Sequence, residues 1–261
     1  GLVDVAPGLR SLLVRFDPAR VHRAVLVDRL QELYERQPEL SSLTLPSRRV
    51  VLPLAFDERA TRQAVARYVT TVRSDAPNTR GGNNIDYLVA QNGLPDREAF
   101  YRAVLETEWW TALTGFAPGL PFLFPLYAPT ALSVPKYNPA RAWTPEGAVG
   151  MGGPCVAVYP VESSGSYQLF GRTVPIYDIL GRNRAFTREP FLLRAGDRVR
   201  FVRVDEAELD ELRRQVLEDR YTYQVVDAPL AVADYLAELR RRGGVGSRSV
   251  PGRRWTETEV P

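Results

Sequence analysis

The sequence is nearly devoid of four residue types: among its 261 residues it has one lysine, one histidine, one cysteine and one methionine. A single cysteine excludes an internal disulfide bond and fits a reducing compartment. His22 precedes the strand-rich remainder of the chain, which excludes a Ser-His-Asp or Cys-His arrangement there and with it nucleophilic catalysis by such a triad. Because Cys and His form no cluster, we expect no metal site, and we expect His22 to be structural.

Long apolar runs and an excess of one charge are also missing. No run approaches the roughly 18 apolar residues that span a bilayer, and the first ten residues lack the regions of a signal peptide. The 34 basic residues face 31 acidic ones, and the only dense positive run lies at 240–244. We therefore expect a cytoplasmic protein with no nucleic-acid or membrane partner. At 44% hydrophobic, the chain can bury the core of one large or two modest domains.

Lysine is the scarcest charged residue: of the 34 lysines and arginines, Lys136 is the one lysine and the other 33 are arginines. A compact ammonium on a flexible stem and a wide planar guanidinium are not interchangeable where a pocket closes around one oxygen. The stretch from Lys136 to Cys155 also holds the single methionine, Met151. We interpret this stretch as the segment that carries the functional residues. A lysine left on a solvated face by a drift toward arginine is the alternative, and composition alone does not separate the two.

Periodicity divides the beginning of the chain into short elements. Residues 11–16 are typical of a strand. Asp17 with Pro18 predicts the start of a helix that runs to about residue 37 and packs one apolar face on a sheet. A polar link over 39–49 marks a domain boundary.

A second unit begins with a strand over residues 50–56. Asp57 is placed to cap a helix that stops before Pro77, and the next segment, NTRGGNN, is expected to be a loop. Two short helices are expected over 84–92 and 96–107, where glycine and proline supply the stop and start signals.

After Glu108 the pattern changes from helical to extended. The segments are short, rich in Val, Tyr, Phe and Thr and broken by Gly and Pro, which predicts an antiparallel barrel or sandwich. We expect strands over 109–116, 130–134, 147–153, 154–161, 166–178 and 197–204. A helix from Asp205 to about 219, a strand over 221–226 and a helix over 230–242 follow. The polar residues from 244 onward predict a flexible or partner-binding tail.

The glycine-rich segment GAVGMGG, residues 147–153, has two interpretations. No lysine and hydroxyl pair follows its glycines, and no helix follows either, which excludes a P-loop. Glycines in an extended segment mark places where a ligand or another backbone comes close. Free N–H groups of Gly150, Gly152 and Gly153 would hold an oxyanion near Lys136. A tight hairpin is the alternative.

The segment GFAPGLPFL, residues 115–123, has two glycines and two prolines among bulky apolar residues. This composition predicts a rigid, shaped loop at the end of a strand. Such a loop suits the wall of a substrate site, and Phe116 and Pro118 are its candidate wall residues. Plain closure of a barrel suits the same pattern equally well.

Taken together, these residues resemble a known family. The motifs that carry the resemblance are LPLAFDERATRQAVARY, VRSDAP, NNIDYL, GFAPGLPFL, KYNPARAWTPEGAVGMGG, YQLFGRT and GDRVRFV. They resemble the allophanate hydrolase subunit 1 family, which includes the second half of the carboxyltransferase domain of urea carboxylase, the B subunit of 5-oxoprolinase and a bacterial histidine-kinase inhibitor. The resemblance covers residues 9–240. KYNPAR with TPEGAVGMGG is closest to the urea carboxylase branch, whereas GFAPGLPFL is closer to the oxoprolinase branch.

The resemblance implies an α+β fold. Its parts are a small N-terminal α/β domain, a cyclophilin-like antiparallel β-barrel and C-terminal helices. We expect domain ranges of 1–48, 49–204 and 205–243, with a tail over 244–261. Family members begin with a further strand and helix, so the N-terminal domain is expected to be incomplete here, and its unpaired edge would need a cover.

The resemblance also implies a site. In this family the active site lies between the barrel and a related barrel from a second subunit. Lys136, Asn138 and Arg141 are the implied catalytic residues: a cation for a carboxylate or ureido oxygen, an amide for a substrate amide and a guanidinium that clamps the pocket. The residues implied to bind substrate or biotin are Gly150, Gly152, Gly153, Tyr167, Gln168, Arg172, Phe116 and Pro118.

The implied activity is biotin-dependent transfer of a carboxyl group to urea or a related amide or guanidine nitrogen. The implied cofactor is biotin, carboxylated on a partner's carrier domain, with ATP used by a partner rather than bound here. The implied partners are a second carboxyltransferase subunit resembling allophanate hydrolase subunit 2, a biotin carboxylase and a biotin carrier.

Two departures from the family pattern keep other functions open. Ser164, Gly165 and Ser166 stand where the family usually has Pro-Gly-Gly, and the loop 115–123 lacks the acidic residue of urea carboxylases. Urea is therefore less secure as a substrate than a larger amide or lactam. The alternatives are the B subunit of an ATP-dependent lactam hydrolase of the oxoprolinase kind and a non-enzymatic regulator that binds a kinase.

Overall fold

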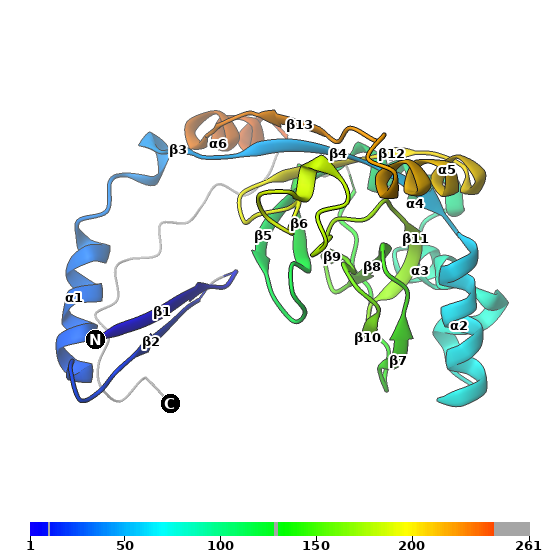
Figure 1. Ribbon diagram of the computed structural model, residues 1–261, viewed down its shortest axis with the longest axis horizontal. Helices are drawn as coiled ribbons and strands as arrows, with labels where there is room; N and C mark the ends of the chain where they lie inside the picture. The colour runs from blue at the N-terminus through cyan, green and yellow to red at the C-terminus, as the bar shows by residue number, and fades with distance from the viewer. Residues whose placement is uncertain (10, 128–129, 243–261) are drawn as a thin grey trace.

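A computed structural model describes residues 1–9, 11–127 and 130–242, and its centre is a closed barrel (Figure 1). The ring order is β11-β8-β9-β6-β5-β12-β4, and pairing of β11 with β4 closes it. The strands are β4 (Arg48–Phe56), β5 (Glu108–Thr114), β6 (Pro121–Tyr127), β8 (Ala148–Gly152), β9 (Cys155–Val158), β11 (Gln168–Arg172) and β12 (Arg198–Arg203). Neighbours are antiparallel except β12 and β4, which run parallel.

The barrel core follows from alternation along β4. Val50, Leu52 and Leu54 recur every second residue and are all fully buried, as expected when alternate side chains point to one face. They belong to one apolar cluster with Trp109 of β5 and Phe170 of β11. The beginning of β4 also pairs with β13 (Gln224–Asp227) outside the ring. The expected α+β class, with a barrel and C-terminal helices, is confirmed.

Five helices surround the barrel and its outer strands. They are α2 (Arg59–Thr71), α3 (Ile85–Gln91), α4 (Arg97–Glu106), α5 (Glu206–Leu217) and α6 (Val232–Arg241). Asp96 and Asp205 cap α4 and α5 by accepting hydrogen bonds from first-turn amides. The expectation for α2 was wrong by one residue: Glu58 accepts from the amides that begin the helix, whereas Asp57 has a φ of 49° and turns the chain.

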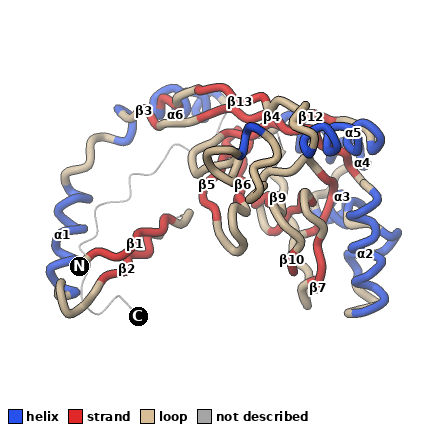
Figure 2. The backbone as a smooth tube through the Cα atoms, in the orientation of Figure 1, coloured by secondary structure: helices blue, strands red, loops and turns tan. Residues whose placement is uncertain are grey.

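Residues 1–9 and 11–45 form an arm that stands apart from the barrel (Figures 1 and 2). The arm holds a hairpin of β1 (Leu2–Pro7) and β2 (Leu12–Phe16), then α1 (Arg23–Glu35), η1 (Leu40–Ser42) and β3 (Thr44–Leu45). The strand expected over 11–16 is confirmed, but α1 starts later than expected because Asp17 closes a turn with Arg20 and Val21. The expected packing of α1 on a sheet was wrong, since none of its residues is buried.

After residue 108 one strand was missed and one predicted strand is absent. Residues 121–127, expected to lie partly in a rigid loop, form β6, because the glycines and prolines confine the turn to 115–120. Residues 130–134 form no strand, and only Val134 bridges to Gly153. The segments expected over 147–153, 154–161, 166–178 and 197–204 contain β8, β9, β11 and β12.

Short elements complete the described chain. They are η2 (Pro77–Gly82), β7 (Arg141–Thr144), β10 (Ser163–Gly165), η3 (Arg184–Phe186) and β14 (Leu230–Ala231). β7 pairs with β10, and β14 pairs with β3. Across the described ranges, no helix has the length and apolarity needed to cross a membrane. The tail expected over 244–261 lies outside the described residues, and the expected domain boundaries stay predictions.

Candidate functional site

The segment 132–140, which we call the Lys136 loop, crosses one end of β8 and β11. Its Val134 exchanges backbone hydrogen bonds with Gly153, and the amide of Tyr137 donates to the carbonyl of Ser166 at 2.6 Å. Lys136 is exposed, and its Nζ lies 5.3 Å from the centroid of the Tyr167 ring. This is a cation–π contact worth about 0.5–1 kcal/mol at an exposed position. Within the described ranges no carboxylate oxygen lies within 4.0 Å of the Lys136 ammonium.

A line of buried amides holds this loop from below. The Nδ2 of Asn78 donates to the Oε1 of Gln168 at 3.0 Å, and the Nε2 of Gln168 donates to the carbonyl of Pro135 at 2.8 Å. We call this line the amide relay. Gln168 was expected to bind substrate, but it is 1% exposed and both ends of its amide are engaged within the chain. Its structural place is therefore beneath the loop rather than at a ligand surface.

A second buried amide, Asn84, joins three segments. Its Nδ2 donates to the Tyr137 hydroxyl at 2.6 Å and to the Asn78 carbonyl at 2.7 Å, and its Oδ1 accepts from the Leu169 amide at 2.8 Å. Asn84 is completely buried. Desolvation raises the pKa of Tyr137, which keeps its hydroxyl neutral. The segment 78–84 is thus fixed to both the Lys136 loop and β11.

Arg141 is a buried cation at the start of β7. It is 1% exposed, donates to the Tyr167 carbonyl at 2.6 Å and to the Thr144 hydroxyl at 3.1 Å, and its guanidinium carbon lies 4.5 Å from the Tyr137 ring centroid. Its Nε lacks a hydrogen-bond partner, and the described residues place no carboxylate within 4.0 Å. Burial leaves Arg141 without direct access to a ligand, so it braces the loop rather than clamping a substrate.

Asn138 is exposed beside Lys136. Its carbonyl accepts from Nη1 of Arg73 at 3.1 Å, and the carbonyl of Pro139 accepts from the Tyr68 hydroxyl at 3.0 Å. Arg73, just after α2, and Tyr68 of α2 therefore hold the backbone of residues 138–139, whereas the exposed Asn138 side chain makes no hydrogen bond to the described residues. Lys136 and Asn138 are brought to the same exposed loop, as the sequence predicts.

The glycines of β8 make room for the chain itself. A β-carbon on Gly152 would lie 2.5 Å from the Tyr167 ring and 3.0 Å from the Lys136 stem, and one on Gly150 would lie 3.0 Å from the Gln168 carbonyl. The N–H of Gly153 donates to the Val134 carbonyl at 2.8 Å. The expectation of a free Gly153 N–H for an oxyanion was wrong, because the Lys136 loop takes that donor.

The turn between β5 and β6 reaches the same region. Ala117 and Phe122 pack on the apolar cluster that contains Tyr167, and the Phe122 and Tyr167 rings meet edge to face at 6.4 Å. Phe116, at a φ of 66°, is 70% exposed, and Pro118 is exposed on the same turn. The turn therefore borders Tyr167 and presents an aromatic ring outward, as a wall residue requires.

Arg172 lies away from this group, at the opposite end of β11 from Gln168. It pairs with Glu58 at 3.5 Å and with Glu146 at 3.7 Å. Desolvation, with repulsion from Arg213, lowers the pKa of Arg172. These ion pairs assign Arg172 to a structural cluster, and the structure does not bring it to Lys136.

Cys155 is the nearest thiol to the site. Burial raises its pKa to about 11, although the hydroxyl of Tyr167 and the charge of Lys136 act in the other direction. A thiol with that pKa is protonated at neutral pH and is a poor nucleophile. Cys155 therefore serves as a small apolar residue in the cluster with Tyr167 and Leu120.

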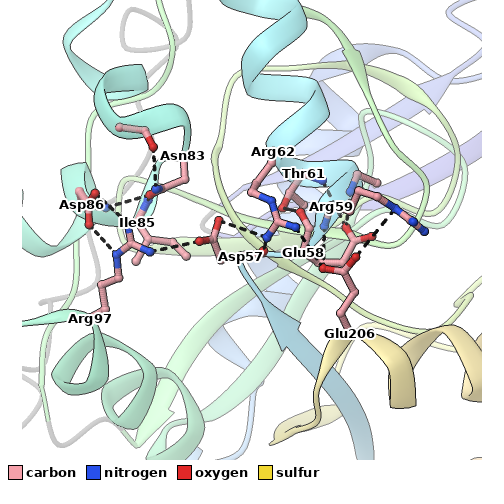
Figure 3. A network of polar contacts seen from close by, with 12 residues as sticks. Asp57, Glu58, Arg59, Thr61, Arg62, Asn83, Ile85, Asp86, Arg97 and Glu206 are labelled. Carbon is pink, nitrogen blue, oxygen red and sulfur yellow. Dashed lines mark hydrogen bonds and ion pairs between the residues drawn. The ribbon is translucent and has the colours of Figure 1, made fainter.

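A second polar region lies where four helices begin (Figure 3). We call it the Asp57 cluster; it comprises Asp57, Arg59, Arg62, Asp86, Arg97 and Glu206. Arg97 donates two hydrogen bonds to the Asp86 carboxylate, at 2.6 and 2.8 Å, and a third to the Asp57 carboxylate at 3.1 Å. Glu206 of α5 accepts from Arg62 and from the Arg59 amide, both at 3.2 Å. All three arginines have a carboxylate partner, which is typical of a structural junction.

Three cavities lie away from the Lys136 loop. One of about 480 Å³ is bordered by Asp57, Tyr101 and Glu206. Another of about 750 Å³ lies between α5 and the segment 177–182, and a third of about 490 Å³ borders the segment 183–194. None is lined by Lys136, Arg141 or Tyr167, and their charged side chains are largely paired within the chain. The exposed Lys136 loop is the better candidate site because its cations have no such partners.

Sequence reasoning missed Asn78, Asn84 and Tyr137. The signal was present in NTRGGNN, where asparagines flank two glycines, but the same composition is typical of any loop. The contact that matters joins Asn78 to Gln168 across 90 positions of sequence.

Comparison with known proteins supports a carboxyltransferase context. A family model described as carboxyltransferase domain, subdomain C and D, matches residues 1–187. The chain is 34% identical over 221 residues to a putative urea carboxylase of Emericella nidulans, which covers 82% of this chain and 17% of the relative. It is 28% identical to the 5-oxoprolinase B subunit of Escherichia coli, with 77% of this chain and 78% of that relative covered.

A solved structure agrees with these relatives. The crystal structure of the Kluyveromyces lactis urea amidolyase matches with a TM-score of 0.84 and 30% identity, over 93% of this chain and 14% of that chain. The chain thus spans about a seventh of that enzyme and 17% of the putative urea carboxylase.

Proposed function

Because this chain belongs to the family of carboxyltransferase domains, subdomain C and D, we propose that it is the half of a biotin-dependent carboxyltransferase that carries Lys136. The acceptor is a nitrogen of urea or of a related amide. Relatives that are urea carboxylases and 5-oxoprolinase subunits support a role as an enzyme component.

One observation carries the proposal: two cations flank Tyr167 and neither has a carboxylate within 4.0 Å in the described part of the chain. Elsewhere the arginines are largely paired with acids. Unpaired positive charge beside an apolar ring attracts an anion and strengthens its interaction where water is excluded. A carboxylate or a developing ureido oxygen is such an anion.

The donor set fits a carboxylated cofactor. Carboxybiotin, brought by a partner's carrier domain, would supply the carboxyl group. Lys136 would hold a carboxylate or ureido oxygen, because its ammonium is exposed and unpaired within the described ranges. Asn138 would orient the acceptor amide through its exposed side chain, since an amide both donates and accepts. Arg141, buried below, would add to the positive potential without touching the ligand.

The exposure of the candidate residues supports a site shared with a partner. Lys136, Asn138 and Phe116 are all exposed. Carboxyl transfer requires exclusion of water, and these residues do not enclose a ligand alone. We propose that a second carboxyltransferase subunit covers the Lys136 loop, and that a biotin carboxylase and carrier complete the enzyme and consume the ATP.

A second candidate is the B subunit of an ATP-dependent 5-oxoprolinase-type lactam hydrolase. The observation that favours it is the similarity to three 5-oxoprolinase B subunits, each 28% identical to this chain over 201 to 209 residues. The turn over 115–120 also lacks an acid. An unpaired Lys136 would then face a lactam oxygen.

Capture followed by assay separates the two functions. The chain is immobilised on a resin and incubated with an extract of the cells it comes from. The bound proteins are then tested for biotin, for carboxylation of urea or an amide, and for ATP-dependent hydrolysis of 5-oxoproline. We expect a biotinylated partner and urea- or amide-dependent fixation of labelled hydrogencarbonate that is lost in Lys136→Arg. Partners that hydrolyse 5-oxoproline with ATP and contain no biotin would overturn the first function and support the second.

A further inference from the structure

The backbone on both sides of Lys136 is fixed by hydrogen bonds. The peptide before it ends in the Pro135 carbonyl, which accepts from Gln168, and the peptide after it supplies the Tyr137 amide, which donates to Ser166. Each peptide is planar, so one bond to each sets the orientation of both planes. The direction in which the lysine stem leaves the loop is therefore determined by these two bonds.

The Gln168 amide is engaged at both ends. Nδ2 of Asn78 donates to Oε1 of Gln168, and Nε2 of Gln168 donates to the Pro135 carbonyl. If the amide turned over, Nε2 would meet the Asn78 donor and Oε1 would meet the Pro135 carbonyl. Both contacts would be repulsive, because each would join like groups. The amide relay therefore has one stable arrangement: the Pro135 carbonyl, which can only accept, orients the Gln168 amide, and the Asn78 donor holds the other end of that amide.

Burial makes the relay costly unless every bond is made. Asn78 is 7% exposed and Gln168 is 1% exposed. A buried amide that loses its partner costs about 1–3 kcal/mol. An apolar side chain at position 168 would pack β11 equally well. The amide of Gln168 differs in that it also donates a hydrogen bond to Pro135, the residue before Lys136.

We propose that Asn78 and Gln168 are positioning residues for Lys136: the amide relay sets the peptide before the lysine so that its ammonium overlies Tyr167. The proposal rests on the function proposed above, in which Lys136 contacts the reacting groups. Asn78 acts through Gln168 and touches no ligand. A displacement of about 1 Å at a reacting group can cost about 100-fold in rate.

Because the chain has a single lysine, the proposal can be tested directly by NMR without an activity assay. Lysine labelled with ¹³C and ¹⁵N gives one side-chain signal from the 261-residue chain, and the Tyr167 ring shifts it. Tyr167→Leu calibrates that shift. We expect Asn78→Ala and Asn78→Asp to move the signal at least halfway toward the calibrated position and to sharpen it. An unmoved signal in the folded Asn78→Asp variant would overturn the proposal.

A matched control separates positioning from general loosening. Asn183 is another fully buried asparagine that holds a loop, accepting from the Ala185 amide and donating to the Tyr221 carbonyl. Asn183→Ala should leave the lysine signal in place. In a Gln168→Leu background, Asn78→Ala should add no further shift, because the relay is already broken. An equal shift in Asn183→Ala, or an additive shift in the double variant, would contradict a relay.

Turnover in the assembled enzyme gives an independent readout. Asn78→Asp should lower kcat about 10- to 100-fold and change KM less than about 3-fold, since a positioning residue acts on the reacting geometry. Full turnover of the Lys136→Arg variant would overturn the proposed function. The lysine signal of the Asn78 variants would still test the amide relay in that case. An unmoved lysine signal would overturn the relay even if Lys136→Arg were inactive.

Discussion

Two polar regions of this molecule differ in composition: one consists of exposed ion pairs and the other of buried neutral amides. In the Asp57 cluster each of the three arginines has a carboxylate partner, and the side chains are 24% to 63% exposed. Beneath the Lys136 loop the polar groups are neutral amides at most 7% exposed, and the two cations beside them have no carboxylate partner in the described residues. Ion pairs join helices in the first region, whereas in the second the exposed ammonium of Lys136 stays available to a ligand.

The difference in burial predicts a difference in energy. Ion pairs that face water are screened and contribute about 0–1 kcal/mol each. Amides that are buried with all their bonds made lose more when one partner is removed. Substitutions near Lys136 should therefore cost more than substitutions in the Asp57 cluster, although the cluster holds more charges.

The largest effect should come from Lys136 itself. Lys136→Met and Lys136→Arg should lower turnover of the assembled enzyme about 10³-fold, equivalent to about 4 kcal/mol of lost transition-state stabilisation. The melting temperature should change little, because Lys136 is exposed and its contact with Tyr167 is worth only about 0.5–1 kcal/mol. Arg200→Lys, an exposed change in β12, is the control and should leave turnover intact. Near-normal turnover of Lys136→Arg would contradict the claim that the Lys136 region, unlike the Asp57 cluster, keeps its charge for a ligand.

Asn84→Ala should produce the largest loss of stability among the polar groups. Three hydrogen bonds disappear and leave the Leu169 amide and two other buried groups unpaired. We expect a loss of about 3 kcal/mol in the free energy of unfolding, measured in urea. A loss below about 1 kcal/mol would show that the buried amides are no more important than exposed ion pairs.

Arg97→Met should cost less, about 1 kcal/mol or below at neutral pH, and the cost should shrink in salt. Hydrogen bonds from Arg97 lower the pKa of Asp86 in the folded chain. This stability is therefore present above the ordinary aspartate pKa and is lost as pH falls through the lowered value. Unfolding free energies of both proteins should converge in acid, and a gap that widens in acid would contradict the assignment.

Arg59→Met should have the smallest effect. Its side chain is 63% exposed and its contacts to Glu206 and Asp210 are 3.8 and 3.5 Å long. We expect the free energy of unfolding to change by less than about 0.5 kcal/mol. A loss above about 2 kcal/mol in thermal unfolding would mean that the Asp57 cluster acts as one cooperative network.

Local patterns were sufficient for much of the fold. Start signals and periodicity predicted α4 and α5, because those signals lie within one turn of the helix; the structure adds that Asp96 and Asp205 cap them. β6 was missed because its apolar run follows directly on a turn rich in glycine and proline. The strand expected over 130–134 failed because strand propensity does not supply a pairing partner.

The candidate site was predictable only in part. The rarity of lysine marked Lys136, and the KYNPAR motif placed Asn138 and Arg141 beside it. The supporting contacts are made between distant segments, as in Asn78 with Gln168 and Asn84 with Leu169. Nor does a sequence distinguish a glycine that admits a ligand from Gly152, whose space is filled by Tyr167 and the Lys136 stem.

The central claim is that the unpaired ammonium of Lys136 meets the reacting groups. The most direct measurement is the signal of isotopically labelled Lys136 in this chain, assembled with unlabelled partners and titrated with urea or the preferred amide. We predict a shift that saturates at the substrate concentration that saturates turnover. A signal that stays fixed while turnover reaches its maximum would contradict the claim.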